Sequence, residues 1–119
     1  MAFWLFLTAM DLLIPAIMVG IGARFLKHPP KTINALYGYR TARSMKNQET
    51  WDFAHETCGK LWVRLGKLSF LPALLAAVLT FGRGIETVRV ASIVVVTIQT
   101  LALIGSIFPV ERALKRKFG

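Results

Sequence analysis

The chain has 119 residues, and 55% of them are hydrophobic, a share above that of ordinary soluble domains. Its formal net charge of +9 comes from 15 Lys and Arg against 6 acidic residues, and the basic residues lie between and after apolar runs. This distribution is typical of a membrane protein whose basic loops contact lipid headgroups, so nucleic acid is not expected as a partner. The single Cys58 excludes an intramolecular disulfide, and no metal site or cofactor is expected.

Three apolar stretches predict an all-α integral membrane protein with three transmembrane helices, in one domain over residues 1–119. The first span covers about residues 2–23, which at 1.5 Å per residue is roughly 30 Å and matches the hydrocarbon core of a bilayer. The second span covers about residues 66–82, and the third covers about residues 88–110. The lipid bilayer is therefore the first expected partner.

Residues 24–65, between the first two spans, predict a structured loop followed by an amphipathic helix. Pro29 and Pro30 interrupt helical continuity in the loop, and Ser44 and Asn47 are candidates for capping the helix. The helix has one apolar face and one charged face at helical spacing. Its apolar face carries Trp51, Ala54, His55, Cys58, Trp62 and Leu65.

Basic residues are distributed unevenly among the segments outside the spans. Nine Lys or Arg occur in residues 24–67 and four follow Glu111, whereas the connection of residues 82–87 holds only Arg83. Because short loops rich in Lys and Arg stay in the cytoplasm, we expect an external N-terminus together with a cytoplasmic loop and C-terminus.

The spans contain polar and small residues that are expected to join the helices. Asp11 in the first span and Gln99 in the third are predicted to lie near the middle of the bilayer, where an ionised carboxylate costs at least a few kcal/mol. The two spans run in the same direction, so we expect a hydrogen bond between these residues; proton or ion handling by Asp11 is the alternative. Ala16 and Gly20 have the small-xxx-small spacing that permits close helix packing.

A second group of polar residues is expected at the cytoplasmic end of the bundle. Arg24 ends the first span, His55 lies on the apolar face of the amphipathic helix, and Glu111 follows the third span. Arg40 and Arg43 belong to the loop between them. Ion pairs that fasten the loop to the bundle are one interpretation, and a binding or catalytic pocket is the other. A histidine on such a face is more often a hydrogen-bonded interior residue than a catalyst or ligand.

One part of the sequence resembles a known family signature. The motif consists of residues 34–41 (NALYGYRT), then Ser44, then a helix with the pattern Trp-x-x-Ala-His that begins at Trp51. It is similar to the signature of the SdpI family of small bacterial membrane proteins. Asp11 in the first span and Glu111 after the third extend the resemblance over nearly the whole chain. The resemblance is to the SdpI domain alone, without the additional N-terminal membrane region of larger members.

The resemblance implies an immunity or resistance protein of the bacterial cell membrane, whose partner would be a secreted, membrane-active peptide toxin. Gly38 is expected in a turn with positive φ, and Arg40 is expected to pair with Glu111 and so close the loop over the bundle. The candidate ligand-binding or partner-binding residues are Asn34, Gly38, Arg40, Thr41, Arg43, Ser44, Trp51, His55 and Glu111.

Two other functions remain open. An enzyme or a binder of a small solute or lipid headgroup would act at the membrane interface through Arg40, Arg43, His55 and Glu111. The sequence contains no P-loop, nucleophile elbow or HExxH motif, which argues against an enzyme, and no catalytic residue is assigned. A homo-oligomeric channel or transporter would place Asp11 along its symmetry axis, because three helices alone cannot enclose an aqueous path.

Overall fold

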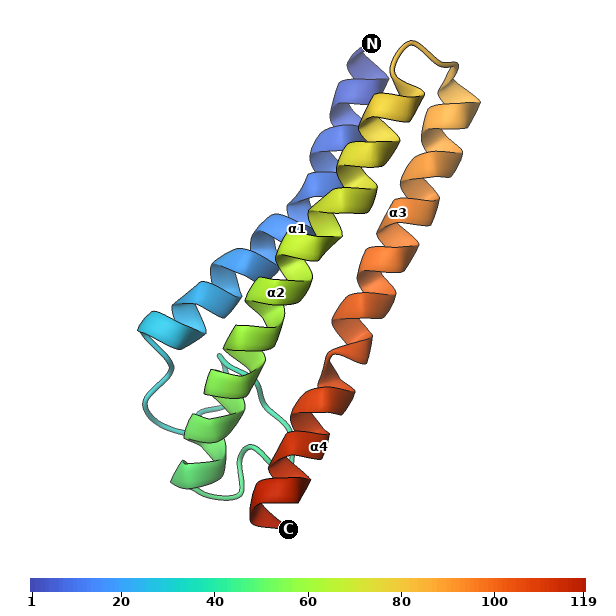
Figure 1. Ribbon diagram of the computed structural model, residues 1–119. Helices are drawn as coiled ribbons and strands as arrows, with labels where there is room; N and C mark the ends of the chain where they lie inside the picture. Colours follow the sequence, from blue (N-terminus) through green and yellow to red (C-terminus); the bar gives the residue numbers. More distant parts are fainter.

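The computed structural model describes residues 1–119 as four helices joined by loops, with no strand. The helices are α1 (Ala2–Lys27), α2 (Gln48–Thr80), α3 (Ile85–Gly105) and α4 (Ile107–Phe118). Figure 1 shows an elongated bundle, with the N-terminus beside the short α2–α3 connection and the C-terminus at the opposite end. We call this opposite end, which carries residues 28–47 and α4, the loop end. The bundle measures 52 × 24 × 21 Å.

Three helical stretches are long and apolar enough to cross a membrane. They are residues 2–27, 48–80 and 85–118, the last of which contains both α3 and α4. Many apolar side chains face outward, such as Leu71 and Val78 of α2, which are 63% and 74% exposed. A surface of this kind suits lipid and is unfavourable in water. The predicted all-α fold with three membrane helices is confirmed, and the chain is a multi-pass membrane protein.

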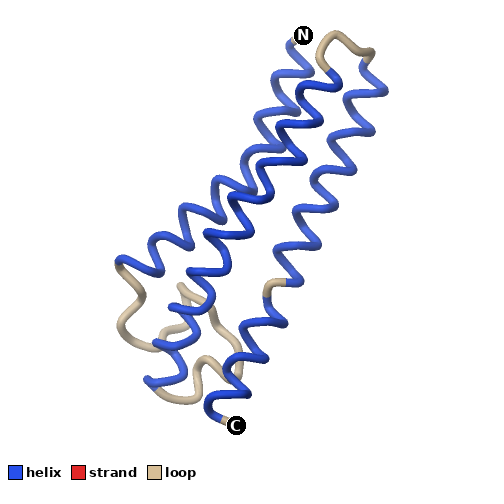
Figure 2. Tube along the Cα trace, viewed as in Figure 1, coloured by secondary structure: helices blue, strands red, loops and turns tan.

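The third span is interrupted at Ser106, where α3 ends and α4 begins, although a single span to residue 110 was expected. Pro109 accounts for the interruption, because it has no N–H to donate to the carbonyl of Gly105 and is tolerated in the first turn of a new helix. Ser106 Oγ donates to the Leu103 carbonyl oxygen at 2.6 Å, which satisfies one carbonyl at the end of α3. Figure 2 shows the interruption as a short non-helical segment between two nearly collinear helices.

Helix α2 joins the amphipathic segment and the second span in one helix of 33 residues. It begins with a capping box, in which Asn47 Oδ1 accepts the Thr50 N–H at 2.9 Å and the Asn47 N–H donates to Thr50 Oγ1 at 3.0 Å. Asn47 is thus confirmed as the capping residue. The first two turns of the predicted apolar face are also confirmed. Their fully buried members are Trp51, Ala54, His55 and Cys58.

Helices α1 and α2 are in backbone contact through three glycines. A Cβ atom on Gly22 would lie 2.9 Å from the carbonyl oxygen of Gly59, and one on Gly59 would lie 2.9 Å from the oxygen of Gly22. A Cβ atom on Gly66 would lie 2.9 Å from the backbone nitrogen of Val19. Such close approach gives van der Waals contact between helices in a membrane, where lipid is as apolar as the side chains. Gly20, predicted to allow this packing, instead faces open space, with no atom within 4 Å of a Cβ built there.

A polar cluster joins the three long helices. Ser92 Oγ of α3 donates to Asp11 Oδ1 of α1 at 2.6 Å. Gln99 Nε2 of α3 donates to the Asp11 carbonyl oxygen at 2.8 Å and to the Ser69 carbonyl oxygen of α2 at 3.2 Å. The predicted hydrogen bond between Asp11 and Gln99 is therefore present, but it uses the backbone of Asp11. The carboxyl group of Asp11 accepts a hydrogen bond from Ser92 instead, which was not expected from the sequence.

Candidate functional site

The loop that precedes α2 turns at Asn34. Asn34 Oδ1 accepts hydrogen bonds from the backbone N–H groups of Leu36 and Tyr37, at 2.9 and 2.7 Å. Arg40 Nε then donates to the carbonyl oxygen of Asn34 at 3.0 Å. These bonds hold the loop tip, which we define as residues 33–37, in one shape while Leu36 remains 95% exposed.

Gly38 lies between the loop tip and α2. Its φ is 122°, a value that residues with a Cβ atom rarely adopt. A Cβ atom on Gly38 would lie 2.6 Å from His55 Nε2 and 3.1 Å from Trp51 Cη2. The expected positive φ is confirmed, and the lack of space is a second reason for glycine at this position.

His55 is fully buried under the loop, and both of its ring nitrogens have partners. Nε2 accepts the Tyr39 N–H at 2.8 Å, and Nδ1 lies 2.7 Å from the Trp51 carbonyl oxygen. Because Nε2 is an acceptor, the proton of the neutral ring is on Nδ1 and is donated to Trp51. The Trp51 ring is also fully buried and donates its Nε1–H to the Pro30 carbonyl oxygen at 2.7 Å. Both residues fasten the loop to α2, so neither ring nitrogen of His55 is free for a ligand.

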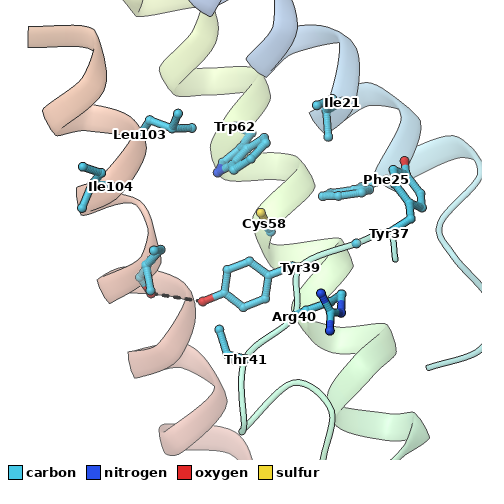
Figure 3. A pocket seen from close by; sticks show the side chains of 12 residues that line it. Ile21, Phe25, Tyr37, Tyr39, Arg40, Thr41, Cys58, Trp62, Leu103 and Ile104 are labelled. Carbon is cyan, nitrogen blue, oxygen red and sulfur yellow. Dashed lines mark hydrogen bonds between the residues drawn. The ribbon is translucent and has the colours of Figure 1, made fainter. Parts of the chain in front are cut away.

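Glu111 of α4 binds the loop through two hydroxyl groups. Its Oε2 accepts hydrogen bonds from Thr41 Oγ1 at 3.0 Å and from the Tyr39 hydroxyl at 3.1 Å. The same hydroxyl lies 3.4 Å from the Ile107 carbonyl oxygen, a contact drawn in Figure 3. Burial, and next the negative charge of Glu111, raise the pKa of Tyr39 well above its usual value. Tyr39 therefore stays neutral and donates to the carboxylate at physiological pH.

The predicted ion pair between Arg40 and Glu111 is wrong. Side chains that follow one another in an extended segment point to opposite sides. Tyr39 and Thr41 both reach Glu111, so Arg40 between them points away and donates to the Asn34 carbonyl instead. Its side chain takes part in neither of the two ion pairs of the structure. The guanidinium is exposed, and its two terminal nitrogens remain free.

Ser44 completes the loop just before α2. Its hydroxyl accepts the Thr41 N–H at 2.8 Å and donates to the Tyr39 carbonyl oxygen at 2.8 Å. Thr50 Oγ1 in turn donates to the Ser44 carbonyl oxygen at 3.1 Å. Arg43, next to Ser44, is exposed and its side chain forms no ion pair. The predicted site residues thus meet at the loop end, but most of their polar groups bind one another.

A pocket of about 410 Å³ lies between the loop and the three long helices. Nine of its 12 lining residues are hydrophobic, so it is an apolar cavity with few polar groups. Among the predicted site residues it is lined only by Gly38, Arg40 and Thr41. Figure 3 shows Tyr39 in the middle of the view, below Trp62 and Cys58 of α2. Sequence reasoning missed Tyr39, whose only signal is an aromatic side chain inside the signature motif.

The comparison with known proteins agrees with the signature of the loop. The model of the SdpI/YfhL protein family matches residues 31–110, more than half of the chain. The chain belongs to the SdpI/YfhL family. The uncharacterized protein YfhL of Bacillus subtilis (strain 168) is 40% identical over 50 residues, which are 42% of this chain and 46% of YfhL, so the chain covers less than half of that relative. No solved structure matches.

The SdpI/YfhL match includes residues 31–47 of the loop, all of α2 and all of α3. It therefore contains the hydrogen bonds that hold the loop tip, His55 and Ser44. Asp11 and Glu111 lie outside residues 31–110, so the match is narrower than the resemblance over nearly the whole chain that was expected. Within the matched region, the signature residues with the most hydrogen bonds serve to fold the loop onto α2.

Proposed function

We propose that this SdpI/YfhL family member protects a bacterial cell against a membrane-active peptide, by binding the peptide or shielding its target at the loop end. The observation that carries the proposal is the loop tip, an apolar surface held in place by hydrogen bonds to Asn34. Leu36 is 95% exposed, and Ile33 and Tyr37 are 36% and 39% exposed. A folded loop that leaves such side chains uncovered is typical of a contact surface.

The hydrogen bonds around the tip favour binding over catalysis. A loop that is already ordered loses little conformational entropy when a partner binds, so more of the contact energy appears as affinity. The signature residues Gly38, Ser44 and Trp51 supply this order and are not themselves open to a partner. In this proposal they act as positioning residues for the tip.

One cation, Arg40, lies beside the apolar tip through its bond to the Asn34 carbonyl oxygen, and a second, Arg43, lies nearer the C-terminus beside Leu114 and Phe118. The guanidinium groups of Arg40 and Arg43 are exposed, and neither has an acidic partner. A planar guanidinium suits a carboxylate or the carbonyl groups of a peptide backbone. The surface therefore suits an apolar peptide segment with oxygen acceptors beside it.

The proposal includes an orientation. The loop end carries most of the basic residues, so we place it in the cytoplasm and the N-terminus outside. A peptide that has inserted into the bilayer would then meet the loop end from within the membrane or from its inner face. This geometry suits protection after insertion of the peptide, not capture of the peptide outside the cell.

An enzyme and a channel have less support. An enzyme using Arg40, Arg43, His55 and Glu111 needs these groups to face one space, but His55 and Glu111 are bound to the loop while both arginines are exposed. A channel between copies needs Asp11 on an outer face, but Asp11 is 4% exposed and binds α3 of its own chain.

The test is survival of a sensitive bacterium that expresses the chain and is challenged with a panel of secreted membrane-active peptides. Wild type is compared with Leu36→Ser and with Ile85→Ser, which replaces an exposed apolar residue at the opposite end of the bundle. At equal amounts of protein in the membrane, we expect Leu36→Ser to lower the protective effect about tenfold, because burial of a leucine contributes about 1.5–3 kcal/mol. Ile85→Ser should protect like wild type.

Either of two outcomes would contradict the proposal. Absence of protection by wild type against every peptide would remove the protective function. Protection by Leu36→Ser equal to that of wild type would remove the loop tip as the contact surface.

A further inference from the structure

The apolar pocket at the loop end adjoins the loop tip but is formed mainly by other residues. Its volume of about 410 Å³ falls within the range of roughly 300–1,000 Å³ found for small-molecule sites. Tyr37 is the one loop-tip residue that lines it and Leu36 does not, whereas Arg40 is also a lining residue. The pocket and a peptide contact at Leu36 therefore use largely different residues.

The pocket is lined by residues of all four helices and of the loop. Figure 3 shows Phe25 of α1 and Ile104 of α3 on its two sides, with Trp62 of α2 between them and the loop residue Tyr39 below. Ile104 and the adjacent lining residue Ile107 are 55% and 42% exposed, so the mouth is flanked by apolar side chains on the outer surface of the bundle. A surface of this kind in a membrane helix faces lipid, and a pocket that opens there is filled from the lipid phase.

The charges around the pocket place it at the boundary between acyl chains and headgroups. Ile104 lies in the apolar part of the third stretch, whereas Arg24 and Lys27 end α1 and Arg112 follows the break between α3 and α4. Basic residues that directly follow apolar spans lie at the level of the headgroups. The upper part of the pocket is therefore at the depth of acyl chains, and its loop side is at the depth of phosphates.

Arg40 supplies a polar group at that lower side. Its Nε is bound to the Asn34 carbonyl, which fixes the guanidinium while the two terminal nitrogens stay free. Two parallel N–H groups of this kind bind a phosphate through two oxygens. No acidic side chain lines the pocket; the nearest carboxylate in its wall, Glu111, lies behind Tyr39 and Thr41 and accepts hydrogen bonds from both hydroxyl groups.

We propose that this pocket binds one anionic phospholipid from the side, with part of an acyl chain between α1 and α3 and the phosphate on Arg40. The apolar lining takes the chain, the lateral mouth admits it from the bilayer, and the free guanidinium selects a lipid with net negative charge. A lipid in this position would fill the gap between helices that the loop leaves open.

The test uses the purified full-length chain in detergent, incubated with equal amounts of phosphatidylglycerol and phosphatidylcholine, and native mass spectrometry to count the lipids retained. Wild type should retain one phosphatidylglycerol in preference to phosphatidylcholine. Arg40→Gln should lower that preference about fivefold, which corresponds to about 1 kcal/mol for one basic group near the headgroups. The matched control is Arg112→Gln, which removes an exposed arginine at the loop end that does not line the pocket.

A second pair of variants tests the pocket itself. Ile104→Trp places a large side chain at the mouth and should abolish retention, whereas Ile93→Trp should not. Both isoleucines belong to α3 and are 55% exposed, but only Ile104 lines the pocket. Leu36→Ser should retain lipid like wild type, which separates this inference from the proposed peptide contact.

Three results would overturn the inference. Equal retention of the two lipids by wild type would exclude selection of an anionic headgroup. Equal losses in Arg40→Gln and Arg112→Gln would show general charge attraction in place of a site. Retention by Ile104→Trp equal to that by Ile93→Trp would place the lipid elsewhere on the bundle.

Discussion

The α1–α2 interface and the contacts of α3 with these two helices are built in different ways. Helices α1 and α2 touch through backbone atoms at Gly22, Gly59 and Gly66. Helix α3 is joined to them through side-chain hydrogen bonds, from Ser92 and Gln99 in the span and from Trp62 Nε1 to Ser106 Oγ at 3.0 Å near its end. The hydrophobic effect does not drive helices together within a bilayer, because lipid is itself apolar. Association of the helices therefore depends on van der Waals contact and hydrogen bonds.

The difference between the α1–α2 interface and the contacts of α3 explains where the pocket lies. Backbone contact leaves no room between α1 and α2 at Gly22, Gly59 and Gly66, whereas hydrogen bonds join α3 at separate points and leave space between them. At the loop end, Tyr39 and Thr41 bind Glu111 of α4, and the pocket lies between these bonds and the one from Trp62 to Ser106. Four substitutions test this difference, in order of decreasing effect.

Gly22→Val should have the largest effect. Its Cβ atom would lie 2.9 Å from a backbone oxygen and 2.9 Å from a backbone nitrogen of α2, so the two helices would have to separate. We expect a loss of about 3 kcal/mol or more in unfolding free energy, measured by denaturation with sodium dodecyl sulfate in mixed micelles. Gly20→Val is the control, because a side chain there meets no atom within 4 Å. Equal stability of the two variants would refute the backbone contact.

Gly38→Ala should come next. It places a Cβ atom 2.6 Å from His55 Nε2 at a φ of 122°, so the loop should be displaced from α2 at a cost of about 2 kcal/mol. Gly82→Ala is the matched control, because its φ of 76° is also positive but a Cβ atom there meets nothing within 4 Å. Proteolysis of the loop in micelles measures the displacement, and cleavage at the same rate in both variants would show that a Cβ atom at Gly38 does not displace the loop.

Gln99→Leu removes two hydrogen bonds, one to α1 and one to α2. Single hydrogen bonds between membrane helices contribute about 0.6 kcal/mol on average, so the unfolding free energy should fall by about 1 kcal/mol. Thr97→Val should cause no comparable loss, since the exposed Thr97 hydroxyl donates only to Ile93 of its own helix. A variant as stable as wild type would mean that α3 is held mainly by packing.

Tyr39→Phe should have the smallest effect at neutral pH, about 0.5 kcal/mol for one hydrogen bond. Its larger effect should be on pH dependence. The folded pKa of Tyr39 is raised above its usual value of 10.0, so above about pH 10 the unfolded chain loses a proton that the folded chain keeps. The stability of wild type should therefore fall more steeply than that of Tyr39→Phe as the pH rises from about 9 to about 11. Parallel melting temperatures over this range would contradict the environment described for Tyr39.

The sequence was sufficient for the features that depend on one helix at a time. Hydropathy located the spans, periodicity located the buried face that contains Trp51 and His55, and residue type limited the cap to Ser44 or Asn47, of which Asn47 is the cap. These features follow from the helical repeat and from local hydrogen bonding, which need no knowledge of the neighbouring helices.

The errors concern which partner a side chain meets. Small-residue spacing predicted that Gly20 packs against a neighbouring helix, but Gly22 is the residue that faces α2. The spacing alone cannot distinguish the two, because packing against the neighbouring helices sets the rotation of α1 about its axis. Arg40 was paired with Glu111 by charge, although alternation along an extended segment directs Tyr39 and Thr41 to that carboxylate instead. The bond from Ser92 to Asp11 depends on the register of α3 against α1, for which a single sequence contains no signal.

The continuity of α2 links the loop end to the thickness of the bilayer. Its 33 residues are about 50 Å long at 1.5 Å per residue, whereas the hydrocarbon core is about 30 Å thick. The loop is hydrogen-bonded to the first turns of α2. It therefore cannot move along the bilayer normal unless the whole helix tilts or shifts. A thinner or thicker membrane would therefore change the height of the loop above the headgroups, and lipid composition would control how deeply the loop tip is immersed.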